Sequence, residues 1–119
     1  MSDLKLTTDE SRSAGVVVHA EGELDLHSAT DLYTRLGDLL DRRPAVFLDL
    51  SQVTFCDSSG YNALLRLHRR ALESGSRFVL VSPHPTVGRL LALTASEGIF
   101  DVYDSQDEAF AAHPVADGG

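Results

Sequence analysis

The chain has 119 residues, of which 43% are hydrophobic, and a formal net charge of −8 at pH 7. These values are typical of one packed domain, and they exclude a second catalytic domain and a wholly disordered chain. The acidic charge disfavours nucleic acid and anionic membranes as partners, because binding to either needs a surplus of basic groups. No apolar run approaches the length of a membrane span and the N-terminus is too polar for a signal peptide, so the protein is expected in the cytoplasm.

The first part of the chain predicts two strands and a helix. Residues 4–7 alternate like a short edge strand, and residues 15–24 contain the β-branched run of a second strand. Ser28 is the candidate N-cap of a helix, and Pro44 forbids continuation of that helix. Its apolar stripe consists of Ala29, Leu32, Tyr33, Leu36, Leu39 and Leu40.

The middle of the chain predicts a buried strand and a second helix. Residues 45–50 form the nearly continuous apolar run of a central strand buried on both faces. A helix over residues 59–73 follows, and Gly75 suits its C-terminal cap. The apolar face is expected to hold Tyr61, Leu64, Leu65, His68 and Leu72. The other face carries Arg66, Arg69 and Arg70, which form either a solvated helix surface or contacts for acidic groups of a partner.

The last part of the chain predicts two more strands, each followed by a helix. Residues 78–82 form a buried strand, and Pro85 suits the first turn of a third helix that ends at Gly98. Residues 99–103 form a short strand, and residues 105–108 fit the capping-box pattern of a terminal helix. Val87, Leu90 and Leu91 form the apolar side of the third helix.

Strands thus alternate with helices through most of the chain. This order predicts an α/β domain over residues 1–112 with right-handed crossovers. Its sheet is expected to be mixed and mostly parallel, with about four or five strands, an antiparallel edge and about four α-helices. Residues 113–119 are predicted to form a disordered tail.

Two acidic segments follow predicted strands, at the edge where α/β sheets gather their functional groups. They are Gly-Glu-Leu-Asp at residues 22–25 and Phe-Cys-Asp-Ser-Ser-Gly at residues 55–60. We expect Asp25 and Asp57 to lie near each other. Ser58 stands where a helix begins, where it or Asp57 caps the first free amides.

Phosphate acceptance is a second role compatible with this position of Ser58. The N-terminus of a helix tolerates a phosphate well, because its free amides and the positive end of its dipole face the anion. Gly60 is expected to remove bulk beside the hydroxyl and to help a kinase approach. Cys56, the only cysteine, can form neither an internal disulfide nor a structural zinc site and is interpreted as a small core residue.

Three segments in the right order resemble the STAS family and, within it, the single-domain bacterial anti-sigma-factor antagonists. They are residues 22–25, 47–51 and 55–60, and the resemblance covers residues 16–111. It implies that the unphosphorylated form binds an anti-sigma factor and releases the sigma factor. The anti-sigma factor is then itself a serine kinase that uses ATP, and its phosphorylation of Ser58 abolishes binding. A separate serine phosphatase resets the switch, and the chain itself needs no cofactor and no metal.

The resemblance also assigns roles around Ser58. The phosphosite is expected to be lined by Asp25, Asp57, Ser59 and Gly60. Partner binding is assigned to Glu23, Tyr61 and Asn62. Tyr61 stands where many relatives carry a small aliphatic residue, and Asn62 where some have glycine, which bears on the identity of the partner more than on the mechanism.

Three other functions are set against this one. A serine hydrolase would need glycine on both sides of its nucleophile, whereas Cys56 lies two residues before Ser58 and no histidine shows a clear base-plus-orienter arrangement. A phospho-aspartate receiver with Asp49 as acceptor would use a lysine on a late strand, but Lys5 is the only lysine, so Asp49 is interpreted as a turn-capping residue at a strand end. The third is a phosphorylation-independent STAS adaptor in another signalling or transport complex. The oligomeric state stays open.

Overall fold

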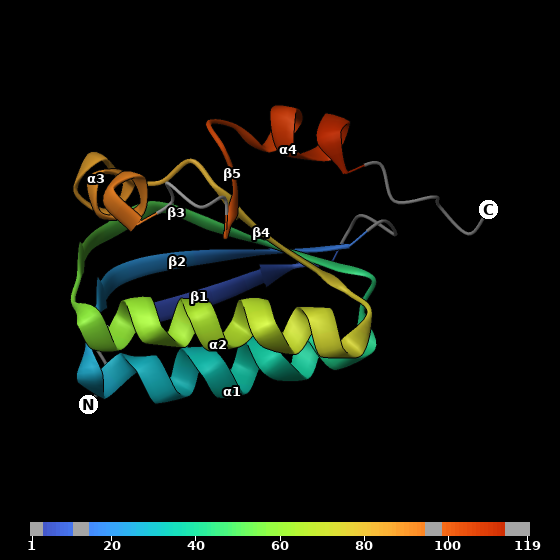
Figure 1. The fold of residues 1–119 in the computed structure, drawn as a ribbon, viewed down its shortest axis with the longest axis horizontal. Helices are drawn as coiled ribbons and strands as arrows, with labels where there is room; N and C mark the ends of the chain where they lie inside the picture. The colour runs from blue at the N-terminus through green and yellow to red at the C-terminus, as the bar shows by residue number, and fades with distance from the viewer. Residues whose placement is uncertain (1–3, 11–14, 95–98, 114–119) are drawn as a thin grey trace.

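The computed structural model describes residues 4–10, 15–94 and 99–113 (Figure 1). Its elements are β1 (Leu4–Asp9), β2 (Val16–Leu24), α1 (Leu26–Arg42), β3 (Ala45–Cys56), α2 (Ser58–Ser74), β4 (Arg77–Val81), α3 (Pro85–Thr94), β5 (Asp101–Tyr103) and α4 (Gln106–Ala112). This order confirms the predicted succession of strands and helices. The predicted end of the third helix at Gly98 and the tail residues 114–119 lie outside the described residues.

The strands form one sheet in the order β1-β2-β3-β4-β5, which is also their order along the chain. β1 pairs antiparallel with β2, whereas β2, β3, β4 and β5 pair parallel to their neighbours. The mixed, mostly parallel sheet with an antiparallel edge is therefore confirmed. Helices α1 and α2 lie side by side along one face of the sheet, and α4 lies over the opposite face (Figure 1).

The central strand β3 is buried on both faces, as its apolar run predicted. Val46 and Leu48 belong to the core beneath α1 and α2, whereas Phe47 belongs to a second core beneath α4. On that second side the Phe47 ring packs edge-on against Phe110, with 4.9 Å between the ring centroids. β3 continues to Cys56, well past the predicted end of the strand, because it keeps pairing with β2 as far as Leu24.

Helix α1 begins earlier than predicted, because Asp25 rather than Ser28 is its N-cap. The Asp25 carboxylate accepts hydrogen bonds from the amides of His27 and Ser28, at 3.0 and 3.1 Å. The Ser28 hydroxyl in turn accepts from the Asp25 amide at 2.9 Å, which completes a reciprocal capping box. Aspartate and serine are equally good N-caps, so composition alone did not separate them.

The buried face of α2 also differs from the prediction. It consists of Gly60, Ala63, Leu64, Leu67 and Ala71. Leu72 was expected in this face but is 69% exposed, and Tyr61 and His68 lie at the core edge with their rings against Phe100. The small residues let α2 lie close to its neighbours, and Leu64 and Leu67 fill the core beside them.

Two of the three arginines of α2 contact α1 rather than solvent alone. Arg70 donates to both carboxylate oxygens of Asp41, at 3.2 and 2.6 Å, and to the Tyr33 hydroxyl at 3.3 Å. The hydrogen bonds that Arg70 donates to Asp41 and Tyr33 raise the pKa of Arg70 above its usual range. The Arg66 guanidinium lies over the Tyr33 ring, 4.1 Å from its centroid, in a cation–π contact.

The start of α2 packs directly on the end of β2. A Cβ atom added at Gly60 would lie 2.5 Å from the Leu24 carbonyl oxygen and 3.1 Å from the Cys56 sulfur. Neither distance is a normal contact for a side chain, so only glycine lets the helix begin at this position. Gly60 faces the interior, and the expectation that it clears space beside a surface hydroxyl is wrong.

A polar cluster on the α4 side of the sheet surrounds Asp49. Its carboxylate accepts from the Ser51 amide at 2.9 Å and contacts His19 Nδ1 at 3.1 Å, and Gln106 of α4 donates to it at 3.4 Å. Burial raises the pKa of Asp49, but the hydrogen bonds from Ser51 and the charge of His19 outweigh it and hold that pKa below its usual range. Asp49 lies inside β3, so its interpretation as a strand-end residue is wrong.

Replacing Gly60 by alanine should destabilise the protein by about 1–3 kcal/mol, because the new methyl group overlaps the Leu24 carbonyl. The matched control is Gly88→Ala in α3, where a Cβ atom would lie 3.8 Å from the Pro83 ring. There the change should be neutral or stabilising by up to about 1 kcal/mol, since alanine is the better helix former. Urea denaturation measures both; equal midpoints for the two variants would contradict the packing described here.

Replacing Asp49 by asparagine should cost about 1 kcal/mol of stability at pH 7. The folded pKa lies below the unfolded value of about 3.9, so the ionised carboxylate favours the folded state at neutral pH. That contribution is lost as the pH falls through the folded pKa, and the wild type and Asp49→Asn should therefore converge in acid. Denaturation series between pH 7 and pH 3 test this. An exposed control, Asp38→Asn, should stay within about 0.5 kcal/mol of the wild type throughout.

Candidate functional site

Two helices begin next to each other at one edge of the sheet. β2 and β3 end in register, with Leu24 opposite Cys56, and the Asp57 amide donates to the Leu24 carbonyl at 3.2 Å. Each strand is followed directly by a helix, so α1 and α2 both start at this edge, at the left in Figure 1. Their N-caps are Asp25 and Asp57, which the sequence analysis expected to be neighbours.

Asp57 rather than Ser58 caps α2. Its carboxylate accepts from the Gly60 amide at 2.9 Å, and its carbonyl accepts from the Tyr61 amide at 2.9 Å. Ser58 is the first residue of the helix and is exposed, whereas Ser59 is half-buried. The Ser58 hydroxyl is thus not needed for the cap, and it faces solvent at the positive end of the helix dipole.

The charges around Ser58 come from both caps. The hydrogen bond from the Ser28 amide holds the pKa of Asp25 below its usual range, although partial desolvation acts against it. Within the described part of the chain, the amides of Ser58 and Ser59 have no acceptor. The edge therefore combines two carboxylates, which repel anions, with free backbone amides, which attract them.

Cys56 lies just behind this edge. It is half-buried, and its thiol points to the Asp57 carbonyl at 3.6 Å. Burial, assisted by the negative charge of Asp57, raises the pKa of the Cys56 thiol to about 11. The thiol is therefore protonated at neutral pH and is a poor nucleophile, in keeping with its interpretation as a packing residue.

Two exposed apolar side chains belong to the ends of elements that meet at this edge, and the sequence analysis missed both. Leu26 is 67% exposed and Phe55 is 45% exposed. Leu26 is the first residue of α1, a position that turns away from the core. If the sequence analysis had placed the N-cap at Asp25 instead of Ser28, it would have predicted that Leu26 is exposed. Phe55 lies near the end of β3. Such exposed anchors are typical of surfaces that bind another protein.

The residues assigned to partner binding lie around the same edge but differ in exposure. Glu23 and Asn62 are exposed, and Glu23 lies two residues before the cap of α1. Tyr61 is half-buried, and its ring packs edge-on against Phe100 at 5.9 Å between centroids. Much of the Tyr61 side chain is therefore committed to the core edge.

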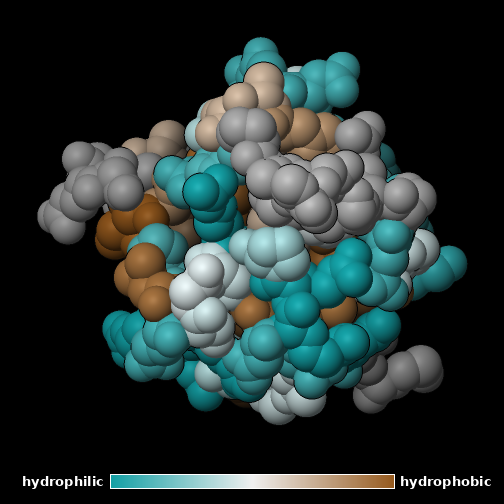
Figure 2. Space-filling view, turned by 90° about the vertical axis from the view of Figure 1, so that its right-hand side faces the viewer, coloured by the Kyte–Doolittle hydropathy of each residue, from teal (hydrophilic) through white to brown (hydrophobic). Residues whose placement is uncertain are grey.

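A groove of about 170 Å³ runs between the N-terminal halves of α1 and α2, starting at Ser59. It is lined by Leu26, Ala29, Thr30, Ser59, Asn62, Ala63 and Arg66. Figure 2 shows the opposite end of the molecule, whose lower part, where α1 and α2 end, is predominantly hydrophilic.

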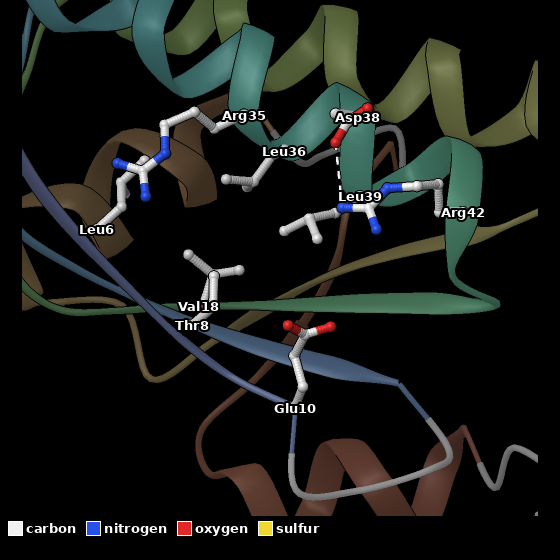
Figure 3. Close-up of a pocket in the computed structure, with 9 residues that line it drawn as sticks. All are labelled: Leu6, Thr8, Glu10, Val18, Arg35, Leu36, Asp38, Leu39 and Arg42. Atoms are coloured by element: carbon white, nitrogen blue, oxygen red, sulfur yellow. Dashed lines mark ion pairs between the residues drawn. The ribbon is translucent and has the colours of Figure 1, made fainter.

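A larger cleft, of about 250 Å³, lies between β1 and α1 (Figure 3). Leu6, Val18, Leu36 and Leu39 form its apolar part. At its rim Asp38 and Arg42 pair at 3.1 Å, so these two charges neutralise each other. None of the predicted site residues lines this cleft, and it contributes nothing to the chemistry at Ser58.

The expectation that no histidine has an orienting carboxylate is wrong for His19. Its Nδ1 atom contacts the Asp49 carboxylate at 3.1 Å. This pair belongs to the α4 side of the sheet, and among the described residues no hydroxyl contacts the other ring nitrogen, so a hydrolase triad is not assembled there. Residues 4–10, 15–94 and 99–113 also hold no group of three side chains suited to a metal ion. In the same part of the chain, no helix has the length and apolar character that crossing a bilayer requires.

Known proteins resemble this chain in sequence and in fold. The chain is 27% identical to the anti-sigma F factor antagonist of Paenibacillus polymyxa over 96 residues, which are 79% of this chain and 82% of that protein. The crystal structure of an anti-sigma factor antagonist from Mycobacterium paratuberculosis superposes with a TM-score of 0.81 at 27% identity, covering 93% of this chain and 94% of the other.

A third known protein is similar to this chain in fold. The Bacillus cell fate determinant SpoIIAA in its phosphorylated form has a TM-score of 0.70 at 20% identity, over 91% of this chain and 98% of that protein, and it shows the fold alone. A family model described as the STAS domain matches residues 5–109. Since that match covers nearly the whole chain and the strand order, helix placement and antiparallel edge agree with it, the chain belongs to the STAS domain family.

Proposed function

We propose that this chain is an anti-sigma factor antagonist, controlled by phosphorylation of Ser58. Unphosphorylated, it binds an anti-sigma factor in the cytoplasm and so releases the sigma factor. The anti-sigma factor is also a serine kinase that uses ATP, and a serine phosphatase restores the binding form. The observation that carries this proposal is the exposed Ser58, whose hydroxyl the Asp57 cap leaves uncommitted at the N-terminus of α2.

The similarity to antagonists of Paenibacillus polymyxa and Mycobacterium paratuberculosis supports the choice of partner. The lining of the site supports a binding role over a catalytic one. Asp57 is committed to its cap, and the raised pKa of the Cys56 thiol keeps it from acting as a nucleophile. Among the described residues, two histidines pair with carboxylates, His19 with Asp49 and His113 with Asp101, and neither pair includes Ser58.

Phosphorylation should change binding far more than stability. A phosphoserine adds about −1.5 to −2 charges at pH 7. Within the fold, the free amides and dipole of α2 favour the anion by about 0.3–1 kcal/mol, which partly offsets repulsion from Asp25 and Asp57. A docked partner has no such compensation, and like-charge juxtaposition at an interface costs several kcal/mol.

The apolar neighbours strengthen this difference. Leu26 begins α1, Phe55 lies near the end of β3 and Ser58 begins α2, so all three belong to the edge that the proposed partner covers. A hydroxyl can be buried there with one hydrogen bond, whereas a phosphate would have to lose its water without a matching cation. In this proposal the exposed leucine and phenylalanine supply affinity, and the serine supplies the control.

Replacing Ser58 by aspartate should weaken binding to the anti-sigma factor by at least about tenfold, which corresponds to roughly 1.4 kcal/mol. Ser58→Ala should bind like the unmodified wild type and should resist phosphorylation by the purified partner with ATP. The matched control is Ser59→Ala, which should still be phosphorylated. Calorimetry measures the affinities, and phosphopeptide mass spectrometry on protein from its native cells locates the phosphate.

Denaturation midpoints of Ser58→Ala and Ser58→Asp are needed beside these data, because an unfolded variant would lose binding for a trivial reason. Both variants should stay within about 1 kcal/mol of the wild type, since the site is exposed. Binding that is unaffected by Ser58→Asp, with Ser58 unmodified under growth, stress and starvation, would indicate the phosphorylation-independent adaptor instead.

A further inference from the structure

The groove between the N-terminal halves of α1 and α2 differs in charge from the edge where the two helices begin. At that edge the helix caps are the carboxylates of Asp25 and Asp57, and Glu23 lies two residues before Asp25. In the groove the single ionisable residue is Arg66, and the rest of the lining is apolar or neutral. Because the whole chain carries a net charge of −8, one exposed cation in a groove is a local exception.

The Arg66 guanidinium is held in place but not neutralised. It lies over the Tyr33 ring at 4.1 Å from the centroid, and no carboxylate of the described residues pairs with it. Asp41 of α1 pairs instead with Arg70, at 2.6 Å. An aromatic face satisfies the charge of an arginine without occupying its N–H donors, so those donors remain available to a ligand.

The lining gives the groove a definite chemistry. Leu26, Ala29 and Ala63 form its apolar part, and a volume of about 170 Å³ suits a single aliphatic side chain. Arg66 follows Ser58 by eight residues on α2, so about 12 Å separates the two positions along the helix axis. A segment docked over Ser58 therefore reaches Arg66 within a few residues.

Building on the antagonist role proposed above, we infer that this groove receives a segment of the anti-sigma factor that carries an aliphatic residue close to an aspartate or glutamate. The aliphatic side chain packs against Leu26 and Ala63, and the carboxylate accepts hydrogen bonds from Arg66. Tyr33 is a positioning residue, since its ring fixes the guanidinium at the end of the groove. The partner thus presents a carboxylate to Arg66, away from the acidic edge around Ser58.

Four variants test this inference by calorimetry against the anti-sigma factor isolated through its affinity for the Ser58→Ala chain. Arg66→Gln should weaken binding about tenfold, because a carboxylate buried at the interface loses its charged partner. Arg69→Gln, an exposed arginine of the same helix outside the groove, should bind as the wild type does. Tyr33→Leu should weaken binding, whereas Tyr33→Phe, which keeps the ring but loses the contact to Arg70, should not.

A charge-swap experiment identifies the partner residue. Arg66→Glu should abolish measurable binding, and an aspartate or glutamate of the partner changed to arginine should restore at least part of it. Denaturation midpoints confirm that each variant is folded, and Arg66 is exposed enough for its replacement to be tolerated.

The outcomes separate the two proposals. If Arg66→Gln and Tyr33→Leu bind as tightly as Arg69→Gln while Ser58→Asp still loses binding, the groove inference is wrong and the antagonist role stands. If no anti-sigma factor binds even to Ser58→Ala, the antagonist role fails and the groove inference falls with it. If Tyr33→Phe weakens binding as much as Tyr33→Leu, the ring is not what positions Arg66.

Discussion

The structure depends on the close contact between the end of β2 and the start of α2. The Asp57 amide bonds to the Leu24 carbonyl at 3.2 Å, and Gly60 approaches that same carbonyl so closely that no side chain would fit. This contact keeps the two parallel strands in register to their last residues and aligns the two helices that follow. A looser junction would separate the helix N-termini, and neither the charged edge nor the groove between the helices would exist. The motif's glycine is therefore a requirement of packing before it is a feature of the site.

The placement of charge follows from that junction. Both helices start with an aspartate cap, so the edge is acidic, and each cap has its carboxylate committed to backbone amides. Further along the two helices, the guanidinium groups of Arg66 and Arg70 both lie over the Tyr33 ring. Asp41 forms an ion pair with Arg70 and so neutralises its charge. The surface thus changes from acidic to basic within two to three turns. A partner that matches it must carry the reverse order of charges, and this order sets the orientation of docking as well as its strength.

The rest of the molecule supports this surface without sharing in its chemistry. α4 covers the second face of the sheet, where the Phe110 ring packs on Phe47 and Gln106 donates a hydrogen bond to Asp49. The His19–Asp49 pair lies on the same face. The thiol of Cys56 lies beside the site, but burial keeps it protonated. Reactive residue types are thus present in the fold, and their surroundings give them structural roles. At the edge itself, Ser58 is exposed and its hydroxyl is not used by the Asp57 cap.

The sequence by itself determined the order of elements, the parallel centre and antiparallel edge of the sheet, and the position of Ser58 at the start of a helix. Those features follow from local patterns: hydrophobic periodicity, glycine and proline signals, and short motifs at strand ends. The tertiary structure decided that Asp25 rather than Ser28 caps α1, which face of α2 is buried, and why Gly60 is glycine. It also decided that Leu26 and Phe55 are exposed, and that among the described residues Arg70 has a carboxylate partner while Arg66 has none. Each of these depends on atoms from segments distant in the chain, such as Leu24 against Gly60 or Tyr33 against Arg66, and no local pattern records contacts of that kind.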